Sequence, residues 1–390
     1  MKQGWERKAL GEIAKFHRGL TYSKGDEVET SSKMVLRSNN VDLDTNSLVL
    51  EDLKCLREDF VIDDDKKVKP NTILICMSNG SKQHIGKVAY IQDDVDFAFG
   101  GFMGLIAPAN NISGKYIFYT CISSHFKHFL AGIGNGIGIT NLRFADLSSF
   151  SLPVPPIAEQ EKIVAELDCL SGIIEKKKQQ LKELDALAQS IFYEMFGNSS
   201  ESIPVSYYIT GLTAGKSLAG DEECSNKVLK TGAVTYDYFD GKQVKNLPLE
   251  YVPALSHKVN INDLLISRMN TAELVGACAY VWRVDDSTYL PDRLWRAEIN
   301  ELSHPVYLWK ALTTDKAKEQ IRNYASGTSG SMKNISKSSF LSVQIPKATL
   351  IKQQVFASKI EAIEKQKELI KQSIQETETL FNSRMDYYFN

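Results

Sequence analysis

Few residues in this sequence have the spacing that catalysis or metal binding requires. The six cysteines are scattered, and the nearest pair, Cys55 and Cys76, is 21 residues apart, which excludes CxxC metal or redox sites. Cys121, His125 and His128 recur at helical spacing and could share one helix face as metal ligands. Because no fourth ligand is in view and the later part of the chain has no equivalent, we expect a packing role for them and no metal site.

A glycine-rich stretch near the middle of the chain approaches a phosphate-binding motif without matching it. A P-loop needs Gly, four residues, then Gly-Lys-Ser/Thr. Residues 211–217 (GLTAGKS) have three residues between the two glycines. We therefore expect residues 215–217 (GKS) to form a turn near the start of a domain that faces DNA, equivalent to Gly19-Leu20-Thr21 earlier in the chain.

Composition describes an ordinary globular protein with no strong charge. The 390 residues are 43% hydrophobic and 24% charged, with a formal net charge of −2. Neither of the two globular parts predicted below, residues 1–154 and 198–345, has an excess of basic residues. This charge balance argues against a protein that binds nucleic acid without partners, although local patches or a basic partner could supply the charge. No apolar run reaches the ~18 residues of a membrane helix. Residues 1–7 are too polar for a signal peptide, so we expect a cytoplasmic location and no membrane partner.

Two long stretches carry the pattern of coiled-coil helices. After Pro155-Pro156, good helix formers continue to Phe196, and apolar residues recur at alternating spacings of three and four. About 40 residues at 1.5 Å each predict a rod of roughly 60 Å that needs a partner to bury its narrow stripe. A second stretch after Ala348-Thr349 repeats the pattern, so the two stretches are expected to pair. The expected seam is Ile163, Leu167, Leu170, Ile174, Leu181, Leu184, Ile191, Phe356, Ile360, Ile363, Ile370, Ile374 and Phe381.

The globular parts repeat as well. Residues 35–41 match 228–234, 72–77 match 263–268, and 86–91 match 276–281. The chain is thus one module written twice, with predicted boundaries at 1–154, 155–197, 198–345 and 346–390. Each globular part has short β-branched runs followed by helical spacing at 115–130 or 306–324, which predicts a mixed α/β domain.

This organisation resembles the specificity subunit of type I restriction-modification systems. The match rests on residues 153–164 (PVPPIAEQEKIV), which open the first long helix, and on the duplicated strand motifs. The resemblance implies two mixed α/β target-recognition domains joined by an antiparallel coiled coil with pseudo-twofold symmetry. In the second copy, Ala348-Thr349 replaces Pro-Pro and Lys352 stands where Glu159 does.

The family implies recognition of double-stranded DNA without catalysis in this chain. Each domain would read one half of a bipartite site, and the helices would set the gap and dock methyltransferase subunits, with two such subunits expected. S-adenosylmethionine, ATP and Mg would be used by partner subunits, including any restriction or motor subunit, and this chain would need no cofactor. The sequence agrees in lacking the (Asn/Asp)-Pro-Pro-aromatic loop expected of an amino-methyltransferase.

Base readout in the major groove needs Arg or Lys for guanine and Asn or Gln for adenine. Within the resemblance, such residues should lie in loops at one edge of each domain. Residues 132–138 (GIGNGIG) are either a connector or a loop whose amides approach phosphates. The candidates are Arg18, Tyr22, Lys24, Arg37, Asn39, Asn40, Asn79, Lys82, Asn141 and Arg143 in the first domain, and Lys216, Lys230, Arg268, Asn270, Arg293, Arg296, Lys333 and Asn334 in the second.

The two domains differ at most of these positions, which predicts an asymmetric target. Residues 79–82 (NGSK) stand against 270–273 (NTAE). Two alternatives remain open: a coiled-coil adaptor that binds only proteins, and a nuclease using Asp263 or Asp292. The nuclease is less favoured, because the first copy has Thr72 and Gly100 in their places.

Overall fold

The chain divides into two units, and each takes in parts of both long helices. The computed structural model describes residues 4–133, 141–199, 201–329 and 332–390, with the side chains of Lys82, Thr328 and Ser329 outside the description. Unit 1 comprises residues 1–178 and 372–390, and unit 2 comprises residues 179–371. The predicted domain boundaries stay predictions. Most of the loop at 132–138 lies outside the described residues.

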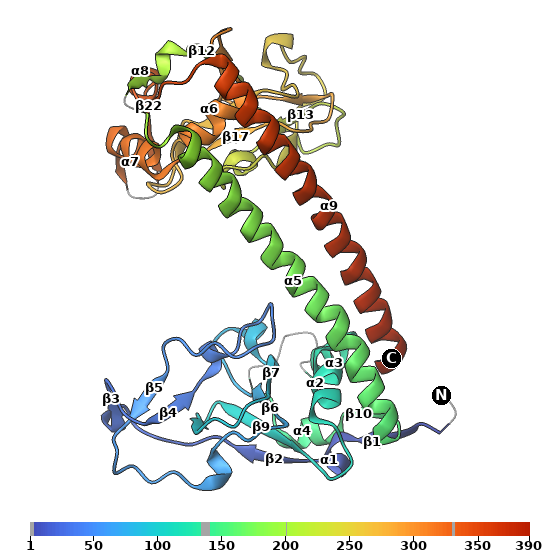
Figure 1. Ribbon diagram of the computed structural model, residues 1–390. Helices are drawn as coiled ribbons and strands as arrows, with labels where there is room; N and C mark the ends of the chain where they lie inside the picture. The colour runs from blue at the N-terminus through green and yellow to red at the C-terminus, as the bar shows by residue number, and fades with distance from the viewer. Residues whose placement is uncertain (1–3, 134–140, 200, 330–331) are drawn as a thin grey trace. The chain divides into compact units, whose positions relative to one another are not determined.

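Unit 1 is built on two four-stranded sheets. The first is antiparallel with the order β2-β9-β6-β7, and the second has the order β3-β5-β4-β8, in which β4 and β8 are parallel (Figure 1). A small sheet pairs β1 with β10. The strands are β1 (Glu6–Ala9), β2 (Ala14–Arg18), β3 (Glu27–Val28), β4 (Lys33–Leu36), β5 (Lys54–Leu56), β6 (Thr72–Cys76), β7 (Val88–Ile91), β8 (Phe97–Phe99), β9 (Met103–Pro108) and β10 (Ser151–Val154).

Unit 2 repeats the central sheet strand for strand. Its order β12-β19-β15-β17 is the order of the corresponding strands in unit 1, so the duplication predicted from short sequence motifs is also a duplication of topology. Further sheets have the orders β14-β13-β18, β11-β22 and β16-β21-β20. The strands are β11 (Ser202–Pro204), β12 (Ile209–Ala214), β13 (Lys227–Leu229), β14 (Val244–Asn246), β15 (Leu264–Ser267), β16 (Met269–Asn270), β17 (Cys278–Tyr280), β18 (Thr288–Tyr289), β19 (Leu294–Ile299), β20 (Ser326–Ser329), β21 (Met332–Asn334) and β22 (Gln344–Pro346).

Each domain contains two consecutive helices in the region where helical spacing predicted one continuous helix. Unit 1 has α2 (Gly114–Ile122) and α3 (Ser124–Ile133), and unit 2 has α6 (Pro305–Leu312) and α7 (Asp315–Tyr324). The breaks have a local cause, because hydroxyl side chains cap the second helix of each pair. Ser123 Oγ accepts from the N–H of Phe126, and Thr314 Oγ1 accepts from the N–H of Ala317. The short helices are α1 (Leu10–Ile13), α4 (Phe144–Ser149) and α8 (Lys337–Leu341).

The long helices α5 (Ile157–Phe196) and α9 (Leu350–Phe389) are 40 residues each and pair antiparallel inside both units. In unit 1, Glu166 of α5 binds Arg384 of α9, and Lys177 binds Ser373, so the numbers rise in one helix as they fall in the other. In unit 2, the Phe192 and Phe356 rings contact with centroids 5.6 Å apart. The ends of both helices enter the cores, where Leu167 and Phe389 pack in unit 1 and Phe196 and Phe356 pack in unit 2. No described helix is long and apolar enough to span a membrane.

Candidate nucleic-acid interface

Seven of the residues predicted to contact DNA line two adjoining cavities of unit 1. The cavities have volumes of about 810 and 480 Å³ and share Ser78, Gly101, Phe102 and Met103 as lining residues. The larger is lined by Tyr22, Arg37, Asn39 and Asn79, and the smaller by Arg18, Asn141 and Arg143. These residues come from loops and strand ends widely separated in the sequence, so the fold brings together what was predicted only as a set.

Backbone pairing explains why these loops converge. Ser78, just beyond β6, forms an isolated antiparallel bridge with Asn141, and the N–H of Leu142 donates to the carbonyl of Met77 at 2.7 Å. On the other side, Leu20 forms a bridge with Gly100. A Cβ at Gly19 would lie 2.0 Å from the Gly100 carbonyl oxygen, so the close approach of these two segments requires glycine at position 19.

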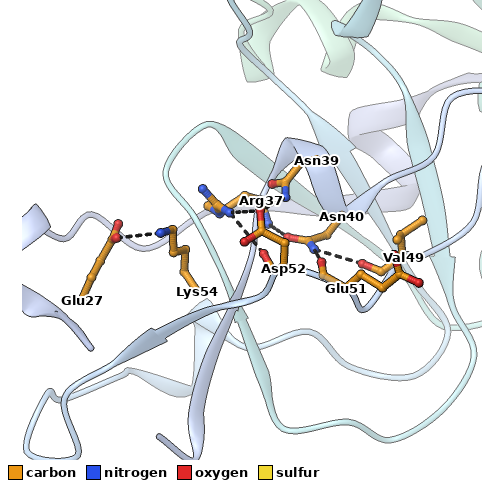
Figure 2. A network of polar contacts seen from close by, with 8 residues as sticks. All are labelled: Glu27, Arg37, Asn39, Asn40, Val49, Glu51, Asp52 and Lys54. Atoms are coloured by element: carbon orange, nitrogen blue, oxygen red, sulfur yellow. Dashed lines mark hydrogen bonds and ion pairs between the residues drawn. The ribbon is translucent and has the colours of Figure 1, made fainter. Parts of the chain in front are cut away.

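The carboxylate of Asp52, which was not among the predicted residues, accepts hydrogen bonds from the predicted residues Arg37 and Asn39. Arg37 Nη2 donates to the backbone carbonyl of Asp52 at 3.2 Å and to its Oδ2 at 3.3 Å, and Asn39 Nδ2 donates to the same Oδ2 at 3.2 Å (Figure 2). The Asp52 side chain is 77% exposed, and its backbone has a left-handed φ of 52°. Arg37 Nε is buried with no hydrogen-bond partner among the described residues. Asp52 thus orders one guanidinium and one amide at the rim of the larger cavity.

The same network shows that Asn40 has a structural role. Its side chain is fully buried, its Nδ2 donates to the carbonyls of Val49 and Glu51 at 3.0 and 2.9 Å, and its Oδ1 accepts from the N–H of Arg37 (Figure 2). Both amide donors are therefore committed to the loop that carries Asp52. This placement argues against the predicted base contact of Asn40 and explains the residue by the support it gives to Arg37 and Asn39.

Other candidates of unit 1 differ in their exposure to solvent and in whether their polar groups already have partners. Arg143 is exposed but makes a bidentate pair with Asp146, which raises the pKa of the guanidinium and lowers that of the carboxyl. Tyr22 is half-buried, and burial, followed by the nearby Glu27 carboxylate, raises the pKa of its hydroxyl. Lys24 is exposed and lines neither cavity, and the side chain of Lys82 lies outside the description.

Phe102 was not predicted, although it lines both cavities and is 72% exposed. In a sequence, an aromatic residue beside a buried strand is expected in the core. The signal that could have identified it is the preceding Gly100-Gly101, which ends the strand and makes a turn.

Unit 2 places several of its candidates around the equivalent strand ends. The N–H of Arg268 donates to the carbonyl of Arg293 at 3.1 Å, and Asn270 pairs in register with Lys333 across β16 and β21. Arg293, Lys216 and Lys230 are exposed. Arg268 lies over the Trp295 ring at 5.8 Å, and its Nε, like Asn334 Oδ1, is buried without a partner among the described residues.

The guanidinium of Arg296 is held by backbone carbonyls of its own unit. Its Nη1 and Nη2 donate to the carbonyls of Lys258 and Ser256 at 2.8 and 2.9 Å. This geometry argues against the predicted base contact, since base readout needs a guanidinium with free donors.

The two carboxylates considered for a nuclease also have local roles. Asp263 Oδ2 accepts from the N–H of Asn260 at 2.8 Å, and burial raises the pKa of this carboxyl. Asp292 accepts a hydrogen bond from the Ser217 hydroxyl, which is part of the turn predicted at residues 215–217. Neither contact brings a second carboxylate close.

The predicted seam residues are all buried or half-buried along α5 and α9. The two polar positions in the stripe find partners. Lys177 Nζ donates to the Ser373 and Thr377 hydroxyls at 2.5 and 3.2 Å, and Lys367 Nζ donates to Asp185 and Glu364 carboxylates at 2.6 and 2.9 Å.

Comparisons with known proteins define the class. Residues 2–186 match the family model of the type I restriction modification DNA specificity domain. The chain is 24% identical over 357 residues to the type I restriction enzyme EcoKI specificity subunit of Escherichia coli K12. The aligned region covers 85% of this chain and 76% of the relative. It is 28% identical over 190 residues to the StySPI specificity subunit of Salmonella potsdam, covering 47% and 40%.

Solved structures agree at the level of the fold. A type I restriction-modification S subunit from M. genitalium superposes with a TM-score of 0.59 at 13% identity, covering 99% of this chain and 96% of that one. A chain from a study of complex assembly and conformational transition of the type I R-M system gives 0.58 at 16% identity, covering 99% and 97%. The predicted resemblance to the specificity subunit of type I restriction-modification systems is confirmed by the family model and by the named relatives.

Proposed function

We propose that each of the two duplicated domains reads one half of an asymmetric, bipartite DNA site. The observation that carries this proposal is the convergence of arginine and asparagine side chains on the adjoining cavities of unit 1, where Arg37 and Asn39 line the larger cavity and Arg18 lines the smaller. These are the side chains that recognise guanine and adenine edges in the major groove. In unit 2, Arg268, Arg293 and Asn270 occupy the corresponding strand ends and supply the second reader.

The half-sites differ because the readers differ. Residues 79–82 (NGSK) follow β6, whereas residues 270–273 (NTAE) lie at the equivalent place in unit 2. A glutamate in place of a lysine reverses the local charge. Identical half-sites would need equivalent donors and acceptors at these positions.

In this proposal, the paired helices set the gap between the two half-sites and dock methyltransferase subunits, two of them in the assembled complex. The near-neutral charge of the chain fits shared DNA binding, in which partner subunits supply much of the phosphate neutralisation. In this proposal the partners bind S-adenosylmethionine, and any restriction subunit binds ATP and Mg. The complex acts in the cytoplasm, where genomic DNA is available.

Mapping modified bases across the host genome, with and without this gene, tests the proposal. The expected result is an asymmetric sequence with two specified parts and an unspecified gap, whose modification disappears when the gene is deleted. A palindromic or continuous site contradicts the proposal. Unchanged modification after deletion favours a protein-binding adaptor instead.

The role of the helices is tested by inserting one heptad into α5 and one into α9 at equivalent positions. Seven residues lengthen a helix by about 10 Å and keep the seam in phase. The gap between the two parts of the modified site should then lengthen by roughly three base pairs, since each base pair rises about 3.4 Å. An insertion of two residues into each helix is the matched control, because it turns the apolar stripe by about 200° and takes the seam out of phase.

A further inference from the structure

Phe102 is presented to solvent by a turn that is fixed from several sides. The Met103 N–H donates to the Gly100 carbonyl at 2.8 Å and closes the turn. The Phe102 carbonyl accepts from the N–H groups of Met77 and Ser78 at 2.9 and 3.2 Å. The Gly100 N–H donates to Leu36 at 2.9 Å. These bonds fix the backbone of the turn from which the exposed ring projects.

The exposure of this ring is unusual within the protein. Of the phenylalanines whose side chains the structure describes, Phe102 is the one found among the exposed large apolar residues. It lines both cavities that hold the predicted DNA-binding residues of unit 1. An aromatic ring held rigidly between polar readers has the chemistry to contact an apolar group on a ligand at little cost in conformational entropy.

Unit 2 has an arginine at the equivalent position. Met103 pairs with Cys76 in the central sheet of unit 1, and Leu294 pairs with Ser267 in that of unit 2. Phe102 and Arg293 each precede that strand, and the carbonyl of each accepts from the residue after the neighbouring strand, Met77 or Arg268. Arg293 is exposed as Phe102 is. The same turn therefore presents an apolar ring in one domain and a cation with several donors in the other.

We infer that this turn reads one base in each half-site: Phe102 contacts the C5-methyl group of a thymine, and Arg293 donates to the O6 and N7 atoms of a guanine. The inference rests on the proposed function. In the major groove, the thymine methyl is the apolar feature of the base edges, and guanine offers two acceptors that match a guanidinium. The difference between the two side chains thus specifies one base of each half-site.

The thymine contact can be tested with the methyltransferase complex assembled around this chain. The probe is a labelled duplex that carries the genomically modified site, and each thymine of the first half-site is replaced in turn by uracil, which lacks only the methyl group. At one position, the wild-type complex should lose about fourfold in affinity, the value of one buried methyl. The Phe102→Ala complex should bind the thymine and uracil duplexes equally at that position.

Phe102→Leu keeps an apolar side chain and should retain part of the sensitivity to uracil. This variant also serves if Phe102→Ala does not assemble. Val61→Ala, which changes an exposed residue that lines neither cavity, is the matched control and should behave as the wild type. The thymine contact is wrong if no uracil substitution gives a loss that depends on Phe102.

The guanine contact is tested with 7-deazaguanine, which lacks the N7 acceptor. At one position of the second half-site, the wild-type complex should lose about tenfold in affinity, within the range of a bidentate contact. Arg293→Ala should remove this sensitivity, and Arg293→Lys should keep part of it. If the wild type binds every substituted duplex equally well, this part is overturned. If the complex does not bind even the duplex without a substituted base, the proposed function itself is refuted.

Discussion

Gln160 and Gln353 share two equivalent hydrogen bonds in their respective units. Gln160 Oε1 accepts from the N–H of Ser113 at 2.9 Å, and Gln353 Oε1 accepts from the N–H of His304 at 2.8 Å. Ser113 and His304 are the N-cap residues of α2 and α6. The side-chain amides donate back to Pro155 and Ala348, the residues that lead into α5 and α9. Each glutamine therefore fixes the first turn of a long helix to its own globular domain.

Replacing either glutamine should destabilise its unit. Gln160→Met and Gln353→Met keep the side-chain volume but leave a buried N–H without an acceptor, so we expect each to lower the free energy of unfolding by about 2 kcal/mol. Urea unfolding monitored by circular dichroism measures the effect. Gln354→Met, one residue further along and exposed, is the control and should change stability little. A similar small change for the two buried positions would contradict the assigned role.

Removing one partner of the buried charge cluster on α9 should also be costly. Lys367 and Glu364 are each 7% exposed and lie 2.9 Å apart. Burial opposes the charge of Lys367, but the bonds to Asp185 and Glu364 outweigh it and the pKa of the amine is raised. Lys367→Met leaves the buried Glu364 carboxylate without the cation that donates to it, and we expect a loss of about 3 kcal/mol in urea unfolding.

The double variant Lys367→Met, Glu364→Met should recover most of that loss, because it removes both buried charges of the pair. Lys365→Met, two residues away and exposed, is the control for a lost lysine on the same helix. If the double variant is no more stable than the single one, the cost lies in packing and not in the unpaired carboxylate.

His304 should make the stability of unit 2 depend on pH. Its Nδ1 accepts from the N–H of Val306 at 3.3 Å, and burial lowers the pKa of the imidazole below its ordinary value of 6.5. The unfolded chain therefore binds a proton more readily than the folded one, so stability should fall as pH drops through about 6.5 and below. His304→Asn supplies a capping side chain that does not titrate, and it should flatten this part of the pH profile. Thermal unfolding between pH 5 and pH 8 measures it, with His128→Asn, an exposed histidine, as the control.

Asp52 should sharpen discrimination between DNA sequences while opposing DNA binding in general. Asp52→Ala frees Arg37 and Asn39 and removes a negative charge. We expect the affinity for the modified site relative to an unrelated duplex to fall about tenfold, and the affinity for the unrelated duplex to rise. Asp59→Ala removes an exposed carboxylate that lines neither cavity and is the matched control. Equal effects of the two substitutions would mean that Asp52 acts only through its charge.

The long helices and the duplication could be predicted because their signals are local or repeated. A seam residue such as Ile163 or Ile360 belongs to a period that holds over many turns, so single exceptions do not hide it. The starts of these helices have a local signal as well, since Ile157 follows Pro155-Pro156 and Leu350 follows the equivalent Ala348-Thr349. The break at Ser123 was missed because apolar spacing continues across it, while the cap depends on one hydroxyl.

The sequence by itself determined the two modules, the α/β character of their domains and the residue types able to read bases. Only the tertiary structure decided which of those residues are available. In the sequence, Asn40 cannot be distinguished from Asn39, nor Arg296 from Arg293. In the structure, the side-chain N–H groups of Asn40 and Arg296 donate to backbone carbonyls from other segments of the chain. Phe102 looked like a core residue until the backbone bonds of its turn placed it outside. Whether a polar group is free depends on partners brought together by folding, and local sequence does not contain that information.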